Sequence, residues 1–186
     1  IRTECTQQTR PRWRTLLALL LNRSDVQKLL PMSKAIDVVE AAFGELSAGT
    51  AEMPDRTVMI DPAVGGWIAY MPAYLKSGGA LGIKAVTVYK ENPTKFGLPT
   101  TIGTILVQDN KTGVVVAVMD GGLLTGIRTG ASGGVATKYL ARKDSKVAGV
   151  LGTGVMARSQ VLALAESANL DTILVYSRSD DPAKQA

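Results

Sequence analysis

A turn of small residues with the spacing G-x-G-x-x-A is the sharpest chemical signal in the sequence. It follows an apolar run, residues 147–151, that is expected to form a strand, and it opens a helical pattern. Gly152 permits a tight turn, Gly154 lets the backbone approach a diphosphate, and Ala157 lets the helix pack closely on the strand. Amide groups at a helix start attract negative charge because they have no partner within the helix. The pattern predicts that a dinucleotide binds at Gly152, Thr153, Gly154, Val155, Met156 and Ala157.

The end of the next predicted strand, residues 172–176, is expected to select the cofactor. An Asp or Glu at that end would bond the ribose hydroxyls and favour NAD. Ser177, Arg178 and Ser179 stand there instead, and their hydroxyls and cation suit a ribose 2′-phosphate. The cofactor is therefore predicted to be NADP or NAD with NADP favoured, although the two aspartates that come next would suit NAD. The alternatives are a glycine-rich turn without a ligand and an Arg178 that is only a solvated loop cation.

The elements around this turn predict a Rossmann-type unit that begins at residue 122. Residues 147–176 have the pattern strand, helix, strand, which is a βαβ unit of a parallel sheet. Residues 122–141 have helical spacing, and glycine is costly inside a helix, so glycines there indicate close approach of another backbone or a ligand. Those glycines are Gly126, Gly130, Gly133 and Gly134.

Residues 16–121 are expected to form a separate α+β domain on a mostly antiparallel sheet. After a first strand, Ser24-x-x-Gln27 matches a capping box that opens a short helix, and Ser33 is expected to cap a second one that ends near Gly49. Short apolar runs separated by glycine or Asn-rich turns then predict strands. These runs are residues 58–60, 67–71, 81–88, 101–107 and 114–119, with a hairpin connection at 109–113. The fold class is thus α/β, with the α+β domain followed by an incomplete doubly wound parallel sheet.

Composition excludes several kinds of site. The sequence has no histidine and a single cysteine, Cys5, which removes histidine-dependent nucleophiles, intrachain disulfides and cysteine metal clusters, so no metal site is expected. The basic excess lies mostly in the first 23 residues, which argues against nucleic-acid binding. The short run at residues 15–21 lacks a cleavage site, so a strand is favoured over a signal peptide. We expect a cytoplasmic protein with no membrane span and with a disordered or artefactual tail at residues 1–15.

Several motifs in order resemble the ornithine cyclodeaminase and mu-crystallin family, which also contains archaeal-type alanine dehydrogenases and ketimine reductases. The likeness covers residues 17–186 and includes the turn at 152–157. The other motifs are Met53-Pro54-Asp55-Arg56, Met71-Pro72-Ala73-Tyr74, Gly82-Ile83-Lys84, Asn92 with Gly97-Leu98-Pro99-Thr100, Met119-Asp120-Gly121, and Leu124-Thr125 with Ile127-Arg128-Thr129-Gly130-Ala131.

The resemblance implies roles for residues outside the turn. Arg56 matches the arginine that binds a substrate carboxylate, and Lys84 matches the active-site lysine that transfers protons at the reacting carbon. Met71 matches a residue near the substrate. Thr100 and Arg128 match positions that contact the cofactor, Arg128 through phosphate, with Thr129 beside it. Read without the family, Arg56 and Lys84 would more often be surface charges.

The family likeness also implies an activity, with alternatives. The expected reaction is NAD(P)-dependent hydride transfer at the α-carbon of a small amino or imino acid, as in alanine dehydrogenase or ketimine reductase. The alternatives are ornithine cyclisation, a non-catalytic NADPH-binding protein like mu-crystallin, and an unrelated Rossmann reductase. A homodimer formed through the sheet of the first domain is expected. The family's catalytic aspartate belongs to a later region that nothing here matches, Asp120 included, so we expect this polypeptide alone to have little or no activity.

Overall fold

Within the described residues, most strands pair into one seven-stranded sheet, in the order β1-β7-β6-β5-β4-β2 with β3 also paired to β4. The computed structural model describes residues 18–177, so the predicted tail at residues 1–15 lies outside it. The strands of this sheet are β1 (Leu19–Leu21), β2 (Ala51–Glu52), β3 (Thr57–Asp61), β4 (Gly66–Leu75), β5 (Ala80–Tyr89), β6 (Thr101–Asp109) and β7 (Val115–Asp120). Every predicted strand before residue 121 is confirmed, and the sheet is mostly antiparallel because only β1 pairs in parallel, with β7.

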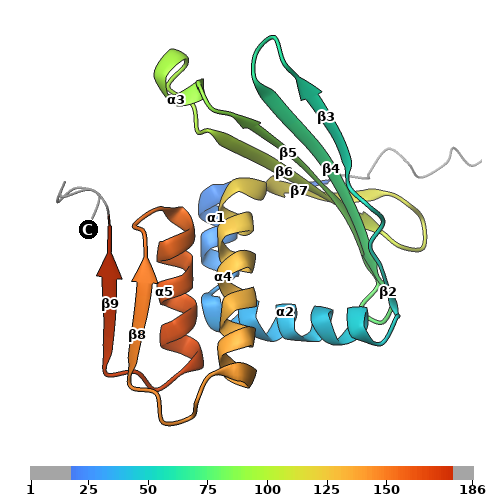
Figure 1. The fold of residues 1–186 in the computed structure, drawn as a ribbon. Coiled ribbons are helices and arrows are strands. Elements are labelled where there is room, and N and C mark those ends of the chain that lie inside the picture. Colours follow the sequence, from blue (N-terminus) through green and yellow to red (C-terminus); the bar gives the residue numbers. More distant parts are fainter. Residues whose placement is uncertain (1–17, 178–186) are drawn as a thin grey trace, which may run out of the picture.

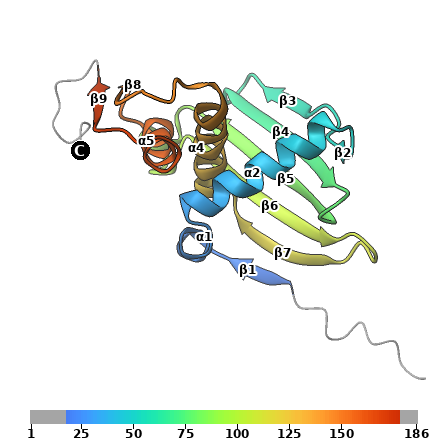
Figure 2. The same ribbon diagram turned by 90° about the horizontal axis from the view of Figure 1, so that it is seen from below.

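The helices lie mainly on one side of this sheet (Figures 1 and 2). They are α1 (Arg23–Leu29), α2 (Met32–Ser47), α3 (Asn92–Lys95), α4 (Gly121–Leu140) and α5 (Val155–Ser167). Figure 2 shows α2 crossing the strands, and the short α3 lies between β5 and β6 at one end of the sheet. The best buried apolar cluster joins α2, α4 and α5 and consists of Ala35, Ile36, Ala131, Val135 and Ala163.

The two predicted helix caps were wrong, although the helices exist. Asn22 caps α1 and forms the capping box with Asp25, because its side chain accepts the backbone N–H groups of Ser24 and Asp25. The second helix, α2, starts after Pro31 without any side-chain cap. Proline fixes its own φ near the value needed before a helix and leaves no N–H to satisfy, so the helix starts there without the help of Ser33. The end near Gly49 is confirmed, since this glycine adopts a left-handed φ of +70°.

Beyond α4 the chain forms a second, two-stranded parallel sheet from β8 (Val147–Leu151) and β9 (Thr172–Tyr176). With α5 between them in sequence, these strands confirm the predicted βαβ unit. Figure 1 shows α5 lying between α4 and this strand pair. Several large apolar side chains of the pair are exposed, and Leu151 reaches 85%. Strands of a parallel sheet are normally covered on both faces, so this sheet has apolar surface that the described residues leave open.

The stripe of glycines in α4 is explained by helix packing. A Cβ at Gly130 would lie 2.5 Å from the carbonyl oxygen of Ser159 in α5, and one at Gly134 would lie 2.8 Å from Ser167 Oγ. The predicted close approach of another backbone is therefore confirmed, and the backbone belongs to α5. Because α5 begins within the turn at residues 152–157, the glycines bring that turn close to α4.

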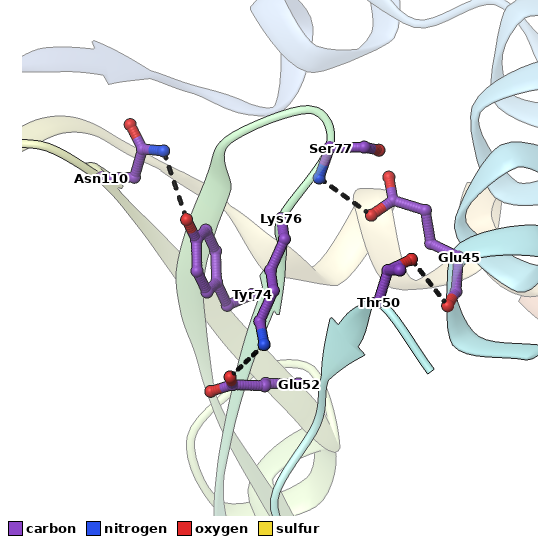
Figure 3. Close-up of polar contacts among 7 residues, drawn as sticks. All are labelled: Glu45, Thr50, Glu52, Tyr74, Lys76, Ser77 and Asn110. Atoms are coloured by element: carbon purple, nitrogen blue, oxygen red, sulfur yellow. Dashed lines mark hydrogen bonds and ion pairs between the residues drawn. The ribbon is translucent and has the colours of Figure 1, made fainter. Parts of the chain in front are cut away.

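Polar contacts connect the C-terminal end of α2 to the edge of the sheet (Figure 3). The backbone N–H of Ser77 donates to the Glu45 carboxylate at 3.2 Å, and the Thr50 hydroxyl donates to the Glu45 carbonyl at 3.1 Å. Lys76 pairs with Glu52 of β2 at 2.6 Å. These groups are largely exposed, so each contributes only modestly to stability. Their effect is to hold β2 beside β4, next to the segment that carries Arg56.

Candidate active site

Lys84 lies in the middle of the sheet, on the side that the helices occupy. In β5 it is the cross-strand partner of Met71 in β4 and of Ile105 in β6. Side chains alternate between the faces of a strand, so Val86, two residues on, shares this side and is buried. Lys84 itself is half-buried. A lysine in such a strand is expected to face solvent, but Lys84 lines a cavity on the side that the helices occupy.

Arg56 reaches the same side through an irregularity in the sheet edge. The strand β2 ends by pairing Glu52 with Tyr74, and β3 begins by pairing Thr57 with Tyr70. Four residues, 53–56, thus face only three on β4, and the extra residue forces the segment away from the ladder. Pro72 lies opposite this gap and has no N–H to donate, so it loses no sheet hydrogen bond there.

One cavity of about 310 Å³ collects the predicted substrate residues. Lys84 and Met71 line it from the sheet, Arg56 from the segment 53–56, and Arg128 from α4. The remaining lining residues are Met53, Pro54, Asp55, Pro72 and Ala73. Three cations thus face one space that a single carboxylate, Asp55, also lines. Such a cavity attracts an anion of small size.

The surroundings of Lys84 lower its pKa from the ordinary value of 10.5. Burial is the largest cause, because it disfavours the charged ammonium, and the nearby cations Arg128 and Arg56 add to it. A lysine in such surroundings holds its proton less tightly than a surface lysine. It is thereby better suited than a surface lysine to give up a proton.

The turn at residues 152–157 combines a glycine in the left-handed region with a helix start that has no side-chain cap. Gly152 has a φ of +103°, which other residues rarely adopt, and its N–H donates to the carbonyl of Tyr176 at 2.7 Å. Gly154 is the N-cap of α5 and supplies no side-chain cap, in contrast to Asp120, whose carboxylate accepts the Leu123 N–H at the start of α4. The first amides of α5 thus have no side-chain acceptor, and they fit the negative charge of a phosphate.

A second cavity of about 360 Å³ lies beside this turn. Its lining includes Gly152, Thr153 and Ala157 together with Arg158, Val161, Leu162 and Val175. Arg158 was not predicted as a site residue. Its guanidinium Nε donates to the Thr153 carbonyl at 3.5 Å, so it lies against the turn. Its position directly after the G-x-G-x-x-A pattern was the available signal, because the first turn of a helix faces its own N-terminal ligand site.

Some predicted cofactor residues lie elsewhere or outside the described chain. Thr100 lines neither cavity, and its carbonyl accepts the Tyr89 N–H at 2.8 Å. Thr129 is half-buried in α4, where its hydroxyl donates to the Thr125 carbonyl at 2.7 Å. Val155 and Met156 are exposed at the start of α5, and Ser177 is half-buried after β9. Arg178 and Ser179 lie outside the described residues.

Comparison with known proteins identifies the family. The sequence profile of the ornithine cyclodeaminase/mu-crystallin family matches residues 17–186. The alanine dehydrogenase of Archaeoglobus fulgidus is 37% identical over 167 residues, which are 90% of this chain and 50% of that protein. The chain therefore belongs to the ornithine cyclodeaminase/mu-crystallin family, and it spans about half the length of the curated relatives it matches.

Solved structures of the family have the same fold. The Thermococcus litoralis Δ1-pyrroline-2-carboxylate reductase in complex with NADH and L-proline gives a TM-score of 0.83 at 50% identity, over 90% of this chain and 51% of that one. An archaeal alanine dehydrogenase dimer with bound NAD gives 0.83 at 37% identity, with the same coverage of 90% and 51%. The predicted α/β class is thereby confirmed.

Among residues 18–177, none of the helices combines the length and the apolar character that a membrane span needs.

Proposed function

We propose that this chain forms the substrate cavity and the diphosphate-binding turn of an NAD(P)-dependent oxidoreductase that acts on a small amino or imino acid. The observation that carries the proposal is the convergence of Arg56, Lys84 and Arg128 on one cavity. When bound, the nicotinamide supplies or accepts the hydride at the α-carbon. The turn at residues 152–157, with its uncapped helix start, supplies the amides for the diphosphate.

The three cations have separate tasks in this proposal. A guanidinium binds a carboxylate through two parallel hydrogen bonds, and Arg56 fixes the substrate in this way. Lys84, whose pKa is lowered by burial and by its neighbours, holds or releases the proton of the substrate nitrogen. In imine reduction the carbon gains a hydride and the nitrogen gains that proton, and in amine oxidation both leave.

Arg128 is proposed to bind the substrate anion beside Arg56. The family resemblance implied a contact between Arg128 and cofactor phosphate, and that role stays a prediction. Gly126 and Gly130 face α5, and Arg128 lies two residues from each. At 3.6 residues per turn, two residues separate directions by about 200° around a helix. Arg128 therefore points away from α5 and toward the cavity that it lines with Lys84.

The choice between NADP and NAD rests on the residues after β9. Of the three that predicted NADP, only Ser177 lies in the described chain. The two solved relatives described above contain NADH or NAD. The preference for NADP stays a prediction that a direct comparison of the two reduced cofactors tests.

We also propose a cytoplasmic location, since a lone cysteine suits a reducing compartment.

We propose that the protein forms a homodimer through the sheet face opposite Lys84. Successive cross-strand partners on that face make an apolar row across five strands. The row consists of Leu20, Val118, Leu106, Ile83 and Pro72. Leu20 is 78% exposed, and within residues 18–177 no helix other than the short α3 lies toward this side (Figures 1 and 2). A similar archaeal alanine dehydrogenase is a dimer, which supports the proposal.

Fluorescence titration with NADH and NADPH tests the proposal first. Saturable binding of either one is the expected result, and binding of neither would overturn it. A panel of linear and cyclic imino acids then tests reduction in an enzyme that contains this chain. Binding without reduction of any of them would favour a non-catalytic NADPH-binding protein. Ammonia release from ornithine without net change in the cofactor would favour the cyclodeaminase alternative.

A further inference from the structure

The contact between α4 and α5 joins the two halves of the proposed site. On one side, α4 carries Arg128 into the Lys84 cavity. On another side, its glycines receive α5, whose N-terminus is the 152–157 turn. The distance from the turn to Lys84 therefore depends on how α5 is seated on α4. Residues that fix this seating control where a dinucleotide held at the turn places its reactive ring.

Glycines allow the two helices to come close but do not fix their position along each other. A glycine surface is smooth, and displacement by one helical turn changes position by about 5.4 Å. A directional polar bond at the contact supplies what the glycines lack, because hydrogen bonds weaken steeply when donor and acceptor move out of line. Gln160 of α5 makes such a bond, since its Nε2 donates to the Thr129 carbonyl of α4 at 3.1 Å.

The side chain of Gln160 also fills the space that Gly133 leaves open. A Cβ at Gly133 would overlap the Gln160 carboxamide. The carboxamide thus lies directly on the backbone of α4, half-buried, with its donor on the carbonyl of the residue next to Arg128. One side chain thereby links the helix of the turn to the part of α4 that lines the Lys84 cavity.

We propose that Gln160 is a positioning residue that sets the register of α5 on α4, and so aligns a dinucleotide bound at the 152–157 turn with Lys84. The inference rests on the proposed function and adds a residue that touches neither substrate nor cofactor. A misplacement of about 1 Å is enough to cost about 100-fold in rate in a positioned reaction. A register change between α4 and α5 is of that size or larger.

Protection of Lys84 by NADH reports alignment without requiring turnover. The full chain, Gln160→Met and Gln160→Ala are each saturated with NADH, and the rate of Lys84 acetylation by acetic anhydride is measured by mass spectrometry. Gln160→Met keeps most of the volume and loses the hydrogen bond, whereas Gln160→Ala loses both. Gln108→Met is the control, because Gln108 makes a similar bond to the Gly113 carbonyl in an exposed hairpin.

In the unaltered chain and in the control, NADH is expected to slow acetylation of Lys84 by about tenfold, because the ring covers the amine. In both Gln160 variants, NADH still binds with a Kd within about threefold of the unaltered value, and protection falls below about twofold. Full protection in both variants would overturn the inference alone. NADH that binds the unaltered chain without protecting Lys84 would overturn the proposed function and the inference together. Loss of NADH binding in step with loss of thermal stability would show a purely structural role and would also overturn it.

Discussion

The cavity around Lys84 and the turn at residues 152–157 are built in opposite ways. The cavity presents side chains, and its lining comes from segments between residues 53 and 128. The turn presents backbone, and its features lie within six consecutive residues. Charge in the cavity comes from three cations, whereas charge at the turn comes from the uncapped end of α5. The cavity is therefore sensitive to the register of the sheet, and the turn is sensitive to the φ and ψ angles of its glycines.

The largest effect is expected from removing the amine of the cavity. In an enzyme that contains this chain, Lys84→Met lowers turnover by about 100- to 10,000-fold, the range for loss of a general acid or base. Affinity for NADH changes little, because the turn is untouched. Steady-state kinetics and a fluorescence titration measure the two quantities. Lys111→Met is the matched control, since Lys111 is exposed in the turn between β6 and β7, away from the cavity. Retained turnover in Lys84→Met would show that the reaction does not depend on the amine in this cavity.

A charge on the apolar row is expected to break the proposed dimer. Ile83→Glu places a carboxylate next to Leu106 and Pro72 on the face opposite Lys84. Burying it without a partner costs several kcal/mol, so the dimer dissociation constant rises by about 100-fold or more. Sedimentation equilibrium measures the change. Ser33→Glu adds the same charge on the exposed side of α2 and leaves the dimer intact. An unchanged dimer in Ile83→Glu would place the interface elsewhere.

Backbone strain at the turn is expected to weaken cofactor binding. Gly152→Ala introduces a Cβ at a φ of +103°, which costs about 1–3 kcal/mol and raises the Kd for NADH by about 10-fold or more. Gly149→Ala is the control in β8, where the added Cβ meets nothing within 4 Å. Calorimetric titration compares the two variants. If both bind NADH as tightly as the unaltered chain, the diphosphate does not lie on this turn.

The pH dependence of Lys84 acetylation tests how the neighbouring cations affect the pKa of Lys84. Arg128 is one of the causes that lower the Lys84 pKa, so Arg128→Gln is expected to move it back toward 10.5. The midpoint of Lys84 acetylation against pH then shifts to higher pH. Arg142→Gln, an exposed change just after α4, serves as the control and leaves the midpoint in place. A shift to lower pH after loss of Arg128 would contradict the assigned like-charge contact.

The smallest effect concerns stability. Because the pKa of Lys84 is lower in the folded chain, the unfolded chain binds more protons between that pKa and 10.5, so stability rises with pH across this window. Below this pH window the amine is charged in the folded chain, and the free-energy cost of burying that charge lowers stability in full. Lys84→Met is therefore expected to raise Tm at neutral pH by no more than about 3 °C, with the gain shrinking as pH approaches 10.5. Calorimetric scans at several pH values measure it, and a lower Tm at neutral pH would contradict the prediction.

The turn was predictable because its evidence is local. The spacing of Gly152, Gly154 and Ala157 and the apolar runs on either side are all visible in one short stretch, and the predicted strand, turn and helix are confirmed. The strands of the larger sheet were predictable for the same reason. Helix starts were less so, because Asn22 and Pro31 competed with Ser24 and Ser33, and side-chain spacing does not decide which residue adopts the N-cap conformation.

The cavity was predictable only through the family likeness. Arg56 lies near Lys84 because residues 53–56 leave the ladder between β2 and β3. No local sequence pattern predicts that these four residues face only three on β4. Arg128 enters the same space from a helix more than 40 residues further along the chain. The glycines of α4 did signal a close neighbour, but they did not identify Gln160 as the side chain that lies on them.

Backbone NMR of the ¹⁵N-labelled chain during titration with NADH tests the central claim most directly. The account predicts that the amide signals of Gly152, Gly154 and Val155 shift with a single saturable affinity, and that the Lys84 amide shifts with the same affinity. Shifts confined to other parts of the sheet, with these four amides unchanged at saturation, would contradict it.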